Sequence, residues 1–201
     1  MKLFSSATSP FVRKVTTLIH EVGLTGIDFL PVGGTPVDPG TMPVDQNPLG
    51  KIPCLLPDDG PALYDSRVIC RYLDSLAGAG LYPAAPRLWD TLVVEATADG
   101  IMEAAVLMVY ETRVRPEDRR HQAWVEGQWA KVARALDALE SRWIDHLAGP
   151  LDMGQIAVGC ALGYLDFRHE ARGWRAGHPK LTAWEQGFAA RTAMQATAPV
   201  A

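Results

Sequence analysis

The spacing of apolar residues changes along this chain, and that change constrains the fold more than any other feature. Up to about residue 77, strand-like runs alternate with helical patterns and with loops rich in glycine and proline. From about residue 86 onward nearly the whole chain has a helical pattern, with abundant Ala, Leu, Glu and Arg. We therefore expect an α+β domain at 1–77, followed by an all-α helical-bundle domain at 86–201.

The first half predicts the order strand, helix, strand, loop, hairpin, helix. Apolar residues at helical spacing follow Pro10, and Gly23 is placed to end that helix in the left-handed conformation. The Asp59-Gly60 pair predicts the hairpin turn. The expected strands and hairpin arms are 2–5, 27–32, 54–56 and 62–64, and the second half predicts helices at about 87–112, 117–146, 152–171 and 179–192.

Bulk properties exclude several function classes. The formal charge of −4 comes with no basic nucleic-acid-binding motif, and no apolar run approaches the roughly 20 residues that cross a bilayer. The first residues contain no extended apolar run, so we expect no secretory signal. The three cysteines (Cys54, Cys70 and Cys160) are far apart and odd in number, which favours a cytoplasmic protein. The five histidines lack metal-ligand spacing, so we expect no metal, no nucleic acid and no membrane.

Ser9 directly precedes Pro10 at the predicted start of the first helix, where serine is a favoured cap and proline a favoured first residue. A helix start carries unpaired N–H groups and a partial positive charge, which together stabilise an anion. A thiolate is such an anion, and a cysteine thiol has a pKa of about 8.5. A hydroxyl hydrogen bond at this terminus can lower that pKa, although a Ser-Pro pair taken alone is more often only a helix cap.

Two more motifs follow. Ile52-Pro53 leads into a strand, and a cis bond there would turn the Ile52 N–H and C=O outward, ready to pair with an extended peptide. At Asp65-Ser66 we expect Ser66 to cap a helix and to help hold a carboxylate, while Asp65 receives an ammonium group. Taken alone, the first motif is typical of a turn before a strand and the second of a helix cap. Together with Ser9 they supply what is needed to hold a small, extended, anionic thiol peptide.

In this order the motifs resemble those of the glutathione transferase superfamily, over nearly the whole chain. Thr8 to Lys14 is similar to the Thr-Ser-Pro-Phe-Val-Arg-Lys segment of bacterial members, and Gly159 to Phe167 is very close to the central helix of some of them. Asp152 with Gln155 matches the cap of that helix, with the roles of the two residues exchanged. The resemblance implies a thioredoxin-like N-terminal domain, an all-helical C-terminal domain, a homodimer and glutathione as co-substrate.

The resemblance also implies the roles of individual residues. Ser9 is the expected activating hydroxyl, with Thr8 as the alternative because related classes differ over which hydroxyl faces the sulfur. We expect Ile52, beside cis-Pro53, to pair with the cysteinyl backbone of glutathione. Lys51 is expected to contact the glycine carboxylate, and the Asp65-Ser66 pair is expected to bind the γ-glutamyl end.

A small hydrophobic electrophile is the expected second substrate, bound between the domains against the helix at 87–112. Phe11, Met102, Val106, Met108 and Tyr110 can form an adaptable apolar wall there, although most of these side chains are also typical of a helix core or a dimer contact.

The same helix carries an acidic face, with Glu95, Asp99 and Glu103 spaced four residues apart. Such a face is commonly solvated. In relatives, an acidic residue on this helix reaches the other subunit's glutathione, and Asp99 is the candidate for that role.

Conjugation of glutathione to an electrophilic carbon, with uses such as detoxification, is the expected reaction. Serine before Pro10 cannot form the mixed disulfides of classes with cysteine there, and Cys54 and Cys70 read as structural. Three other glutathione-dependent reactions stay open: isomerisation, reductive dehalogenation and peroxide reduction. A non-catalytic scaffold of the same architecture also stays open, although it would need none of the three motifs.

Overall fold

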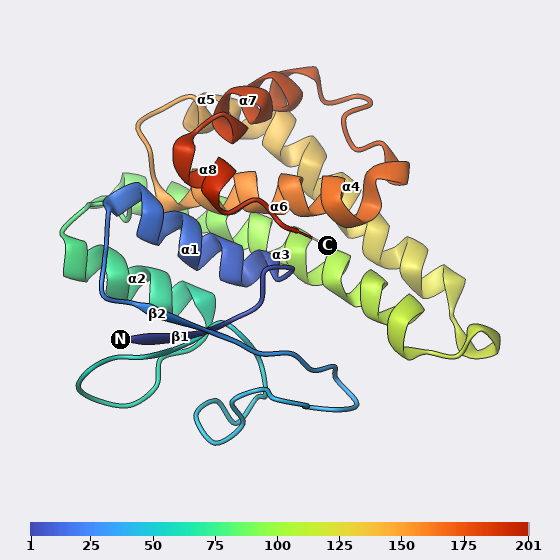
Figure 1. Cartoon of the computed structure of the whole chain (residues 1–201). Coiled ribbons are helices and arrows are strands. Elements are labelled where there is room, and N and C mark those ends of the chain that lie inside the picture. Colours follow the sequence, from blue (N-terminus) through green and yellow to red (C-terminus); the bar gives the residue numbers. More distant parts are fainter. Residues whose placement is uncertain (201) are drawn as a thin grey trace.

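A small mixed sheet forms the base of the molecule in the computed structural model, which describes residues 1–200 (Figure 1). Its strands are β1 (Lys2–Ser5), β2 (Asp28–Pro31) and β3 (Cys54–Leu56), in the order β2-β1-β3. β1 pairs in parallel with β2 and antiparallel with β3. The predicted second arm of the hairpin is reduced to one bridge, between Leu55 and Leu63. Pro61 has no N–H to donate, and helix α2 begins soon after Leu63, so the arm cannot lengthen.

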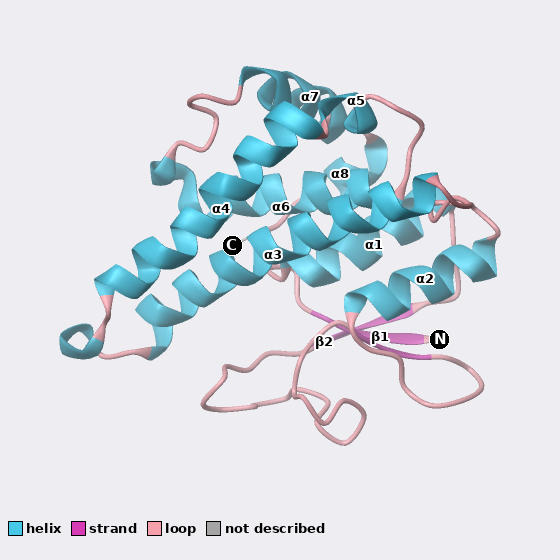
Figure 2. Cartoon of the chain, turned by 180° about the vertical axis from the view of Figure 1, so that it is seen from behind, coloured by secondary structure: helices cyan, strands magenta, loops and turns pink. Residues whose placement is uncertain are grey.

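Helices α1 (Pro10–Val22) and α2 (Ser66–Ala77) lie on the same side of this sheet (Figure 2). Ser9 caps α1 and Pro10 opens it, as predicted. Gly23 ends the helix in the left-handed conformation, with φ of 68°. The expected cap of α2 was wrong by one residue, because the Asp65 side chain accepts the Arg67 N–H and Ser66 is already the first helical residue.

The second half of the chain is helical throughout. Its longest helix, α3, packs along α6 and α4; α5 and α7 lie at the top of the bundle in Figure 1, and α8 packs against α1. The helices are α3 (Arg87–Val114), α4 (Gln122–Arg142), α5 (Ile144–Leu147), α6 (Met153–His169), α7 (Pro179–Ala189) and α8 (Thr192–Ala196), with 3₁₀ turns at Glu117–Arg119 and Glu170–Arg172. The predicted α+β fold class with a helical second half is therefore confirmed.

Several predicted helix boundaries were wrong. The helix expected at 117–146 begins only at Gln122, because the Glu111 carboxylate on α3 accepts the His121 N–H at 2.8 Å and holds the chain in a turn. The His121 ring then caps α4 through Trp124 N–H at 3.0 Å. The last predicted helix, 179–192, ends at Ala189, and α8 follows as a separate helix.

Helix α6 is the centre of the bundle, since its residues from Met153 to Leu162 are buried on every face. A helix surrounded by protein cannot leave its first N–H groups to water, so these groups need a cap. The predicted capping box is present: Asp152 accepts Gln155 N–H, and Gln155 accepts Asp152 N–H. Asp152 also accepts hydrogen bonds from Thr91 at 2.9 Å and Arg87 at 3.2 Å, which attaches α6 to the first turns of α3.

We expect Asp152→Ala to lower the free energy of unfolding by about 2–4 kcal/mol, because it removes a cap and leaves buried donors unpaired. Urea denaturation followed by circular dichroism measures this change. The matched control is Asp59→Ala, which removes an exposed loop carboxylate. A loss no larger than the roughly 0.5 kcal/mol typical of surface substitutions would show that the cap does not stabilise α6.

Candidate active site

The strand register brings the three sequence motifs to one edge of the sheet. Phe4 of β1 pairs with Cys54 of β3, so the next step places Ser5 opposite Pro53. Leu55 pairs with Leu63, so the same continuation places Asp65 opposite Pro53. The end of β1, which leads into Ser9, therefore lies beside the Ile52-Pro53 and Asp65-Ser66 motifs. Residues separated by up to 57 positions in the sequence meet at this edge.

The Ser9 hydroxyl has its proton available. Its oxygen accepts the Val12 N–H at 3.3 Å, and no described residue accepts the hydroxyl proton in return. Thr8 differs, because its hydroxyl lies 3.2 Å from the hydroxyl of Ser6 and the two can bond each other. Both side chains are half-buried at the mouth of a narrow pocket, which is lined by Thr8, Ser9, Pro10, Arg13, Tyr164 and Pro199.

Arg13 is a charged wall of this pocket that the sequence analysis did not single out. Its guanidinium lies over α6 at Gly163, where a Cβ would collide with Arg13 Nη1. Nη2 donates to the Met194 carbonyl at 3.1 Å, and the buried Nε has no hydrogen-bond partner among the described residues. The only trace of this contact in the sequence is Gly163, the small residue that leaves room for Arg13. The sequence alone does not show that these two residues are neighbours.

The Ile52–Pro53 peptide bond is cis, and the Tyr64–Asp65 bond is cis as well. Neither the N–H nor the C=O of Ile52 has a hydrogen-bond partner within residues 1–200, so both are available to a ligand. Asn47 fixes the preceding turn, since its side chain donates to the Lys51 carbonyl at 2.7 Å and accepts Leu49 N–H at 3.1 Å. The Lys51 side chain is exposed beside this turn.

Asp65 already has a cation beside it in this chain. Arg67 Nη2 lies 2.8 Å from Asp65 Oδ2, with both side chains about half exposed at 51% and 52%. Burial raises the pKa of Asp65, but hydrogen bonds from Arg67 outweigh that effect and lower the pKa below its usual value. The carboxylate is therefore charged near neutral pH, next to the buried Ser66 at the start of α2.

Two residues of the acidic face predicted on α3, Glu95 and Asp99, are buried, whereas the third, Glu103, is exposed as a solvated face would be. Lys14 of α1 is fully buried, and its Nζ lies 2.8 Å from Asp99 and 3.1 Å from Glu95. Burial alone would lower the pKa of Lys14, but nearby Cys70, Asp99 and Glu95 raise it above its usual value. The expected contact between Asp99 and a second subunit's glutathione stays a prediction, and it has to form while Asp99 holds Lys14.

Only part of the predicted electrophile wall is open. Met102 and Met108 are buried in the core, so they cannot form part of an open wall and their assignment to it was wrong. Phe11, Val106 and Tyr110 are partly exposed and remain able to contact a ligand.

The three cysteines are buried, and burial raises the pKa of each thiol, which disfavours thiolate chemistry. No three His, Cys, Asp or Glu side chains among the described residues are placed to hold a metal ion. No described helix is both long and apolar enough to cross a membrane.

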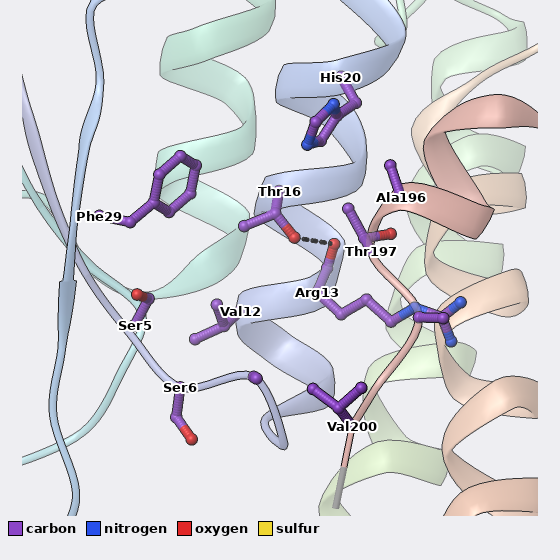
Figure 3. A pocket seen from close by; sticks show the side chains of 12 residues that line it. Ser5, Ser6, Val12, Arg13, Thr16, His20, Phe29, Ala196, Thr197 and Val200 are labelled. Atoms are coloured by element: carbon purple, nitrogen blue, oxygen red, sulfur yellow. Dashed lines mark hydrogen bonds between the residues drawn. The ribbon is translucent and has the colours of Figure 1, made fainter.

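A larger pocket of about 310 Å³ lies on another face of α1. Figure 3 shows Val12, Thr16 and His20 along the helix, opposite Phe29 of β2 and the segment after α8. Neither Ser9 nor any other predicted site residue lines it.

Comparison with known proteins identifies the family. Residues 8–76 match the family model of the glutathione S-transferase N-terminal domain, and residues 122–187 match that of the C-terminal domain. The chain belongs to the glutathione S-transferase family. This transferase-family chain is 34% identical to the uncharacterized GST-like protein YibF of Escherichia coli K12, over 99% of this chain and 98% of that protein.

A glutathione transferase family member from Pseudomonas fluorescens Pf-5 is similar along the whole chain. In its crystal structure with bound glutathione, the sequence is 44% identical to this chain, and the match covers 100% of this chain and 99% of the relative. The two structures superpose with a TM-score of 0.96. A second structure, with bound S-(propanoic acid)-glutathione, is also 44% identical and has a TM-score of 0.92, with both chains covered fully. The thioredoxin-like N-terminal domain followed by a helical domain is thus the fold of this family member.

We expect Lys14→Met to lower the free energy of unfolding by about 3–5 kcal/mol at pH 7, because two buried carboxylates lose the cation they share and only Asp99 keeps a second one, Arg67 at 3.7 Å. In the wild type the pKa of Lys14 is raised, so its contribution to the free energy of unfolding is fully present up to the usual lysine pKa. This contribution should therefore not change between pH 5 and 9. In the variant the unpaired carboxylates take up protons more readily than in the unfolded chain, so the deficit shrinks as pH falls. Urea titrations at several pH values measure it.

Lys180→Met is the matched control, since that lysine is exposed on α7. A Lys14→Met deficit as small as that of the control, or one that is constant with pH, would contradict a buried ion cluster.

Proposed function

We propose that this protein binds glutathione and activates its thiol as a thiolate through Ser9. The observation that carries the proposal is the Ser9 hydroxyl, which accepts a hydrogen bond from the α1 backbone and still has a proton to donate. A sulfur placed at this helix start receives that hydrogen bond together with the partial positive charge of the helix terminus. Thr8 is the second choice, because Ser6 competes for its hydroxyl.

The rest of the tripeptide follows the same edge of the sheet. The unpaired N–H and C=O of Ile52 pair with the cysteinyl backbone of glutathione beside cis-Pro53, in the way an added strand pairs with a sheet edge. Asp65 holds the γ-glutamyl ammonium group, and Ser66 with the first N–H groups of α2 holds its carboxylate. Lys51 contacts the glycine carboxylate. The relative from Pseudomonas fluorescens with bound glutathione supports a glutathione site in this chain.

Conjugation is the reaction we propose. The thiolate attacks an electrophilic carbon, a new S–C bond forms, and the leaving group departs with its electron pair. Phe11, Val106 and Tyr110 supply the apolar side of the second-substrate site. The relative that holds S-(propanoic acid)-glutathione supports conjugation, because the sulfur of that ligand is bonded to a second carbon that does not belong to glutathione. We assign the reaction to the cytoplasm, where buried free cysteines stay reduced.

We expect Ser9→Ala to raise the pKa of bound glutathione by about one to two pH units and to lower turnover about tenfold or more near neutral pH. Affinity for glutathione changes little, because its backbone and carboxylate contacts remain. The thiolate absorbance near the ultraviolet edge, followed as pH is varied, measures the pKa. Ser9→Gly, which as a cap costs only a few tenths of a kcal/mol, separates the lost hydroxyl from a weakened helix.

Thr8→Val is the control for the neighbouring hydroxyl. If Thr8→Val shifts the thiol pKa and the Ser9 variants do not, the activating group is Thr8. Complete absence of glutathione binding in the wild type would instead favour the scaffold alternative.

We propose a homodimer formed through α2 and α3. Apolar side chains that stay exposed in the single chain gather on these helices: Val68 and Leu76 on α2, and Trp89 and Val93 on α3. Burying such residues against a second copy removes apolar area from water.

We expect light scattering to give twice the chain mass for the wild type and a shift toward the single-chain mass for Val93→Glu, because a buried carboxylate without a partner is costly. Val37→Glu, on the loop after β2, is the control and keeps the dimer. A wild type of single-chain mass would overturn the proposed dimer.

A further inference from the structure

Helices α3 and α6 together carry a group of basic and aromatic side chains next to the second-substrate region. We call it the arginine–tyrosine cluster: Tyr110 and Arg113 on α3, with Tyr164, Phe167 and Arg168 on α6. Val106, Tyr110 and Arg113 are spaced so that they share one face of α3. The two helices pack along each other, and His169 at the end of α6 bonds the Ala105 carbonyl of α3 at 3.0 Å.

Tyr164 joins this cluster to the thiol site. It lines the narrow pocket that also contains Ser9, Thr8 and Arg13. Its ring centroid lies 6.5 Å from that of Phe167, and Arg168 stacks on Phe167 with its guanidinium carbon 3.9 Å from the ring centre. A group bonded to a sulfur at Ser9 would contact Tyr164 first, and Arg168 lies one helical turn further along α6. Arg113 is also close enough to Tyr164 to affect its pKa.

The charges of the cluster are not neutralised within the chain. Neither Arg113 nor Arg168 forms a salt bridge with any described residue, whereas Arg67, Arg175 and Arg191 each pair with a carboxylate. The nearest acid on this face of α3 is Glu103, ten residues before Arg113 and so about 15 Å away along the helix. Glu103 lies instead close to Arg67, whose pKa it helps to raise after the larger effect of Asp65.

The cluster is also held in place before any ligand arrives. The Arg168 guanidinium stacks on the Phe167 ring, which restricts its orientation and keeps it near Tyr164. Tyr164 is 5% exposed, and burial with nearby Tyr110 raises its pKa to about 12 despite the opposing effect of Arg168 and Arg113. Its hydroxyl is therefore protonated at neutral pH and can donate a hydrogen bond. Two guanidinium groups and a phenol that donates are a site for an anion, and above all for a planar carboxylate.

We propose that the second substrate of this enzyme carries a carboxylate, which Arg168, Arg113 and Tyr164 bind while the glutathione thiolate attacks an electrophilic carbon nearby. This inference rests on the proposed glutathione site and names the substrate class. With a halogenated carboxylic acid the S–C bond forms as the C–halogen bond breaks, and the halide leaves with the bonding electrons. The carboxylate takes no part in bond making; it places the reacting carbon at the sulfur.

Two glutathione thioethers that differ only in their outer end test the proposal by binding alone. S-(2-carboxyethyl)glutathione carries the carboxylate, and S-propylglutathione replaces it with a methyl group. Isothermal titration calorimetry on the wild type should give a Kd for the carboxylated ligand about tenfold or more below that of the propyl ligand, as expected for charge-assisted hydrogen bonds. Unmodified glutathione is titrated in parallel to measure the tripeptide site by itself.

Arg168→Met should remove most of this preference, and Arg113→Met a smaller part, because Arg113 is the more exposed of the two. Arg168→Lys keeps the charge and should restore part of it. Arg134→Met, which removes an exposed arginine from α4, is the control for long-range charge and should leave the preference unchanged. Glutathione itself should bind all four variants as it binds the wild type.

The outcomes separate the two proposals. If glutathione binds but the carboxylated ligand has no advantage, or if the advantage persists in Arg168→Met and Arg113→Met, the carboxylate site is wrong and the glutathione site stands. If the control variant loses the preference as fully as Arg168→Met, the effect is overall charge and the assignment is again wrong. If glutathione and both thioethers fail to bind the wild type, both proposals fall together.

Discussion

The ion cluster of Lys14, Glu95 and Asp99 is the interaction on which the rest of the structure depends. It places a fully buried ammonium group from the α+β half between two buried carboxylates of the helical half. Isolated, each of these charges would cost several kcal/mol to bury, so each is stable only with the others in position. The cluster therefore fixes α1 against α3, and with α1 it fixes the site that begins at Ser9. Directional charge pairs hold this orientation in a way that apolar packing alone does not.

Three residues at and near the start of helix α1 position the site. Its first turn is capped by Ser9, Arg13 reaches α6 across Gly163, and Lys14 enters the ion cluster on α3. Successive residues of a helix point about 100° apart, so one short helix can contact the pocket, the central helix and α3 at once. The Arg13 contact needs a glycine on α6, and this links the identity of residue 163 to the pocket at Ser9.

Local patterns were enough to predict the fold class and the motifs, because caps, turns and periodicity act over a few residues. Ser9 before Pro10, Gly23 and the Asp152–Gln155 box each satisfy a local geometric need, and each lies where expected. Some misses came from long-range partners. Helix α4 begins only after His121 because Glu111 holds the His121 backbone, and Glu95 and Asp99 are buried because they pair with Lys14, which lies 81 and 85 residues earlier in the sequence. Asp65 takes the cap expected of Ser66, because Asp65 has the extended backbone of an N-cap and Ser66 is already helical; this miss is local, a boundary shifted by one residue.

Charge changes sign along one face of α3, and this ordering connects the two halves of the site. Glu95 and Asp99 anchor Lys14, Glu103 lies beside Arg67, and Arg113 stands at the far end without a carboxylate. The acids in the first part of α3 lie beside cations of the α+β half, so their charge is already balanced within the folded chain. The arginines at the far end have no such partner in the chain, and their charge is left for a ligand. The start of α3 joins the two halves of the chain, and its end carries the proposed anion site. The length of α3 can therefore set the distance between the glutathione thiol and the carboxylate of the second substrate.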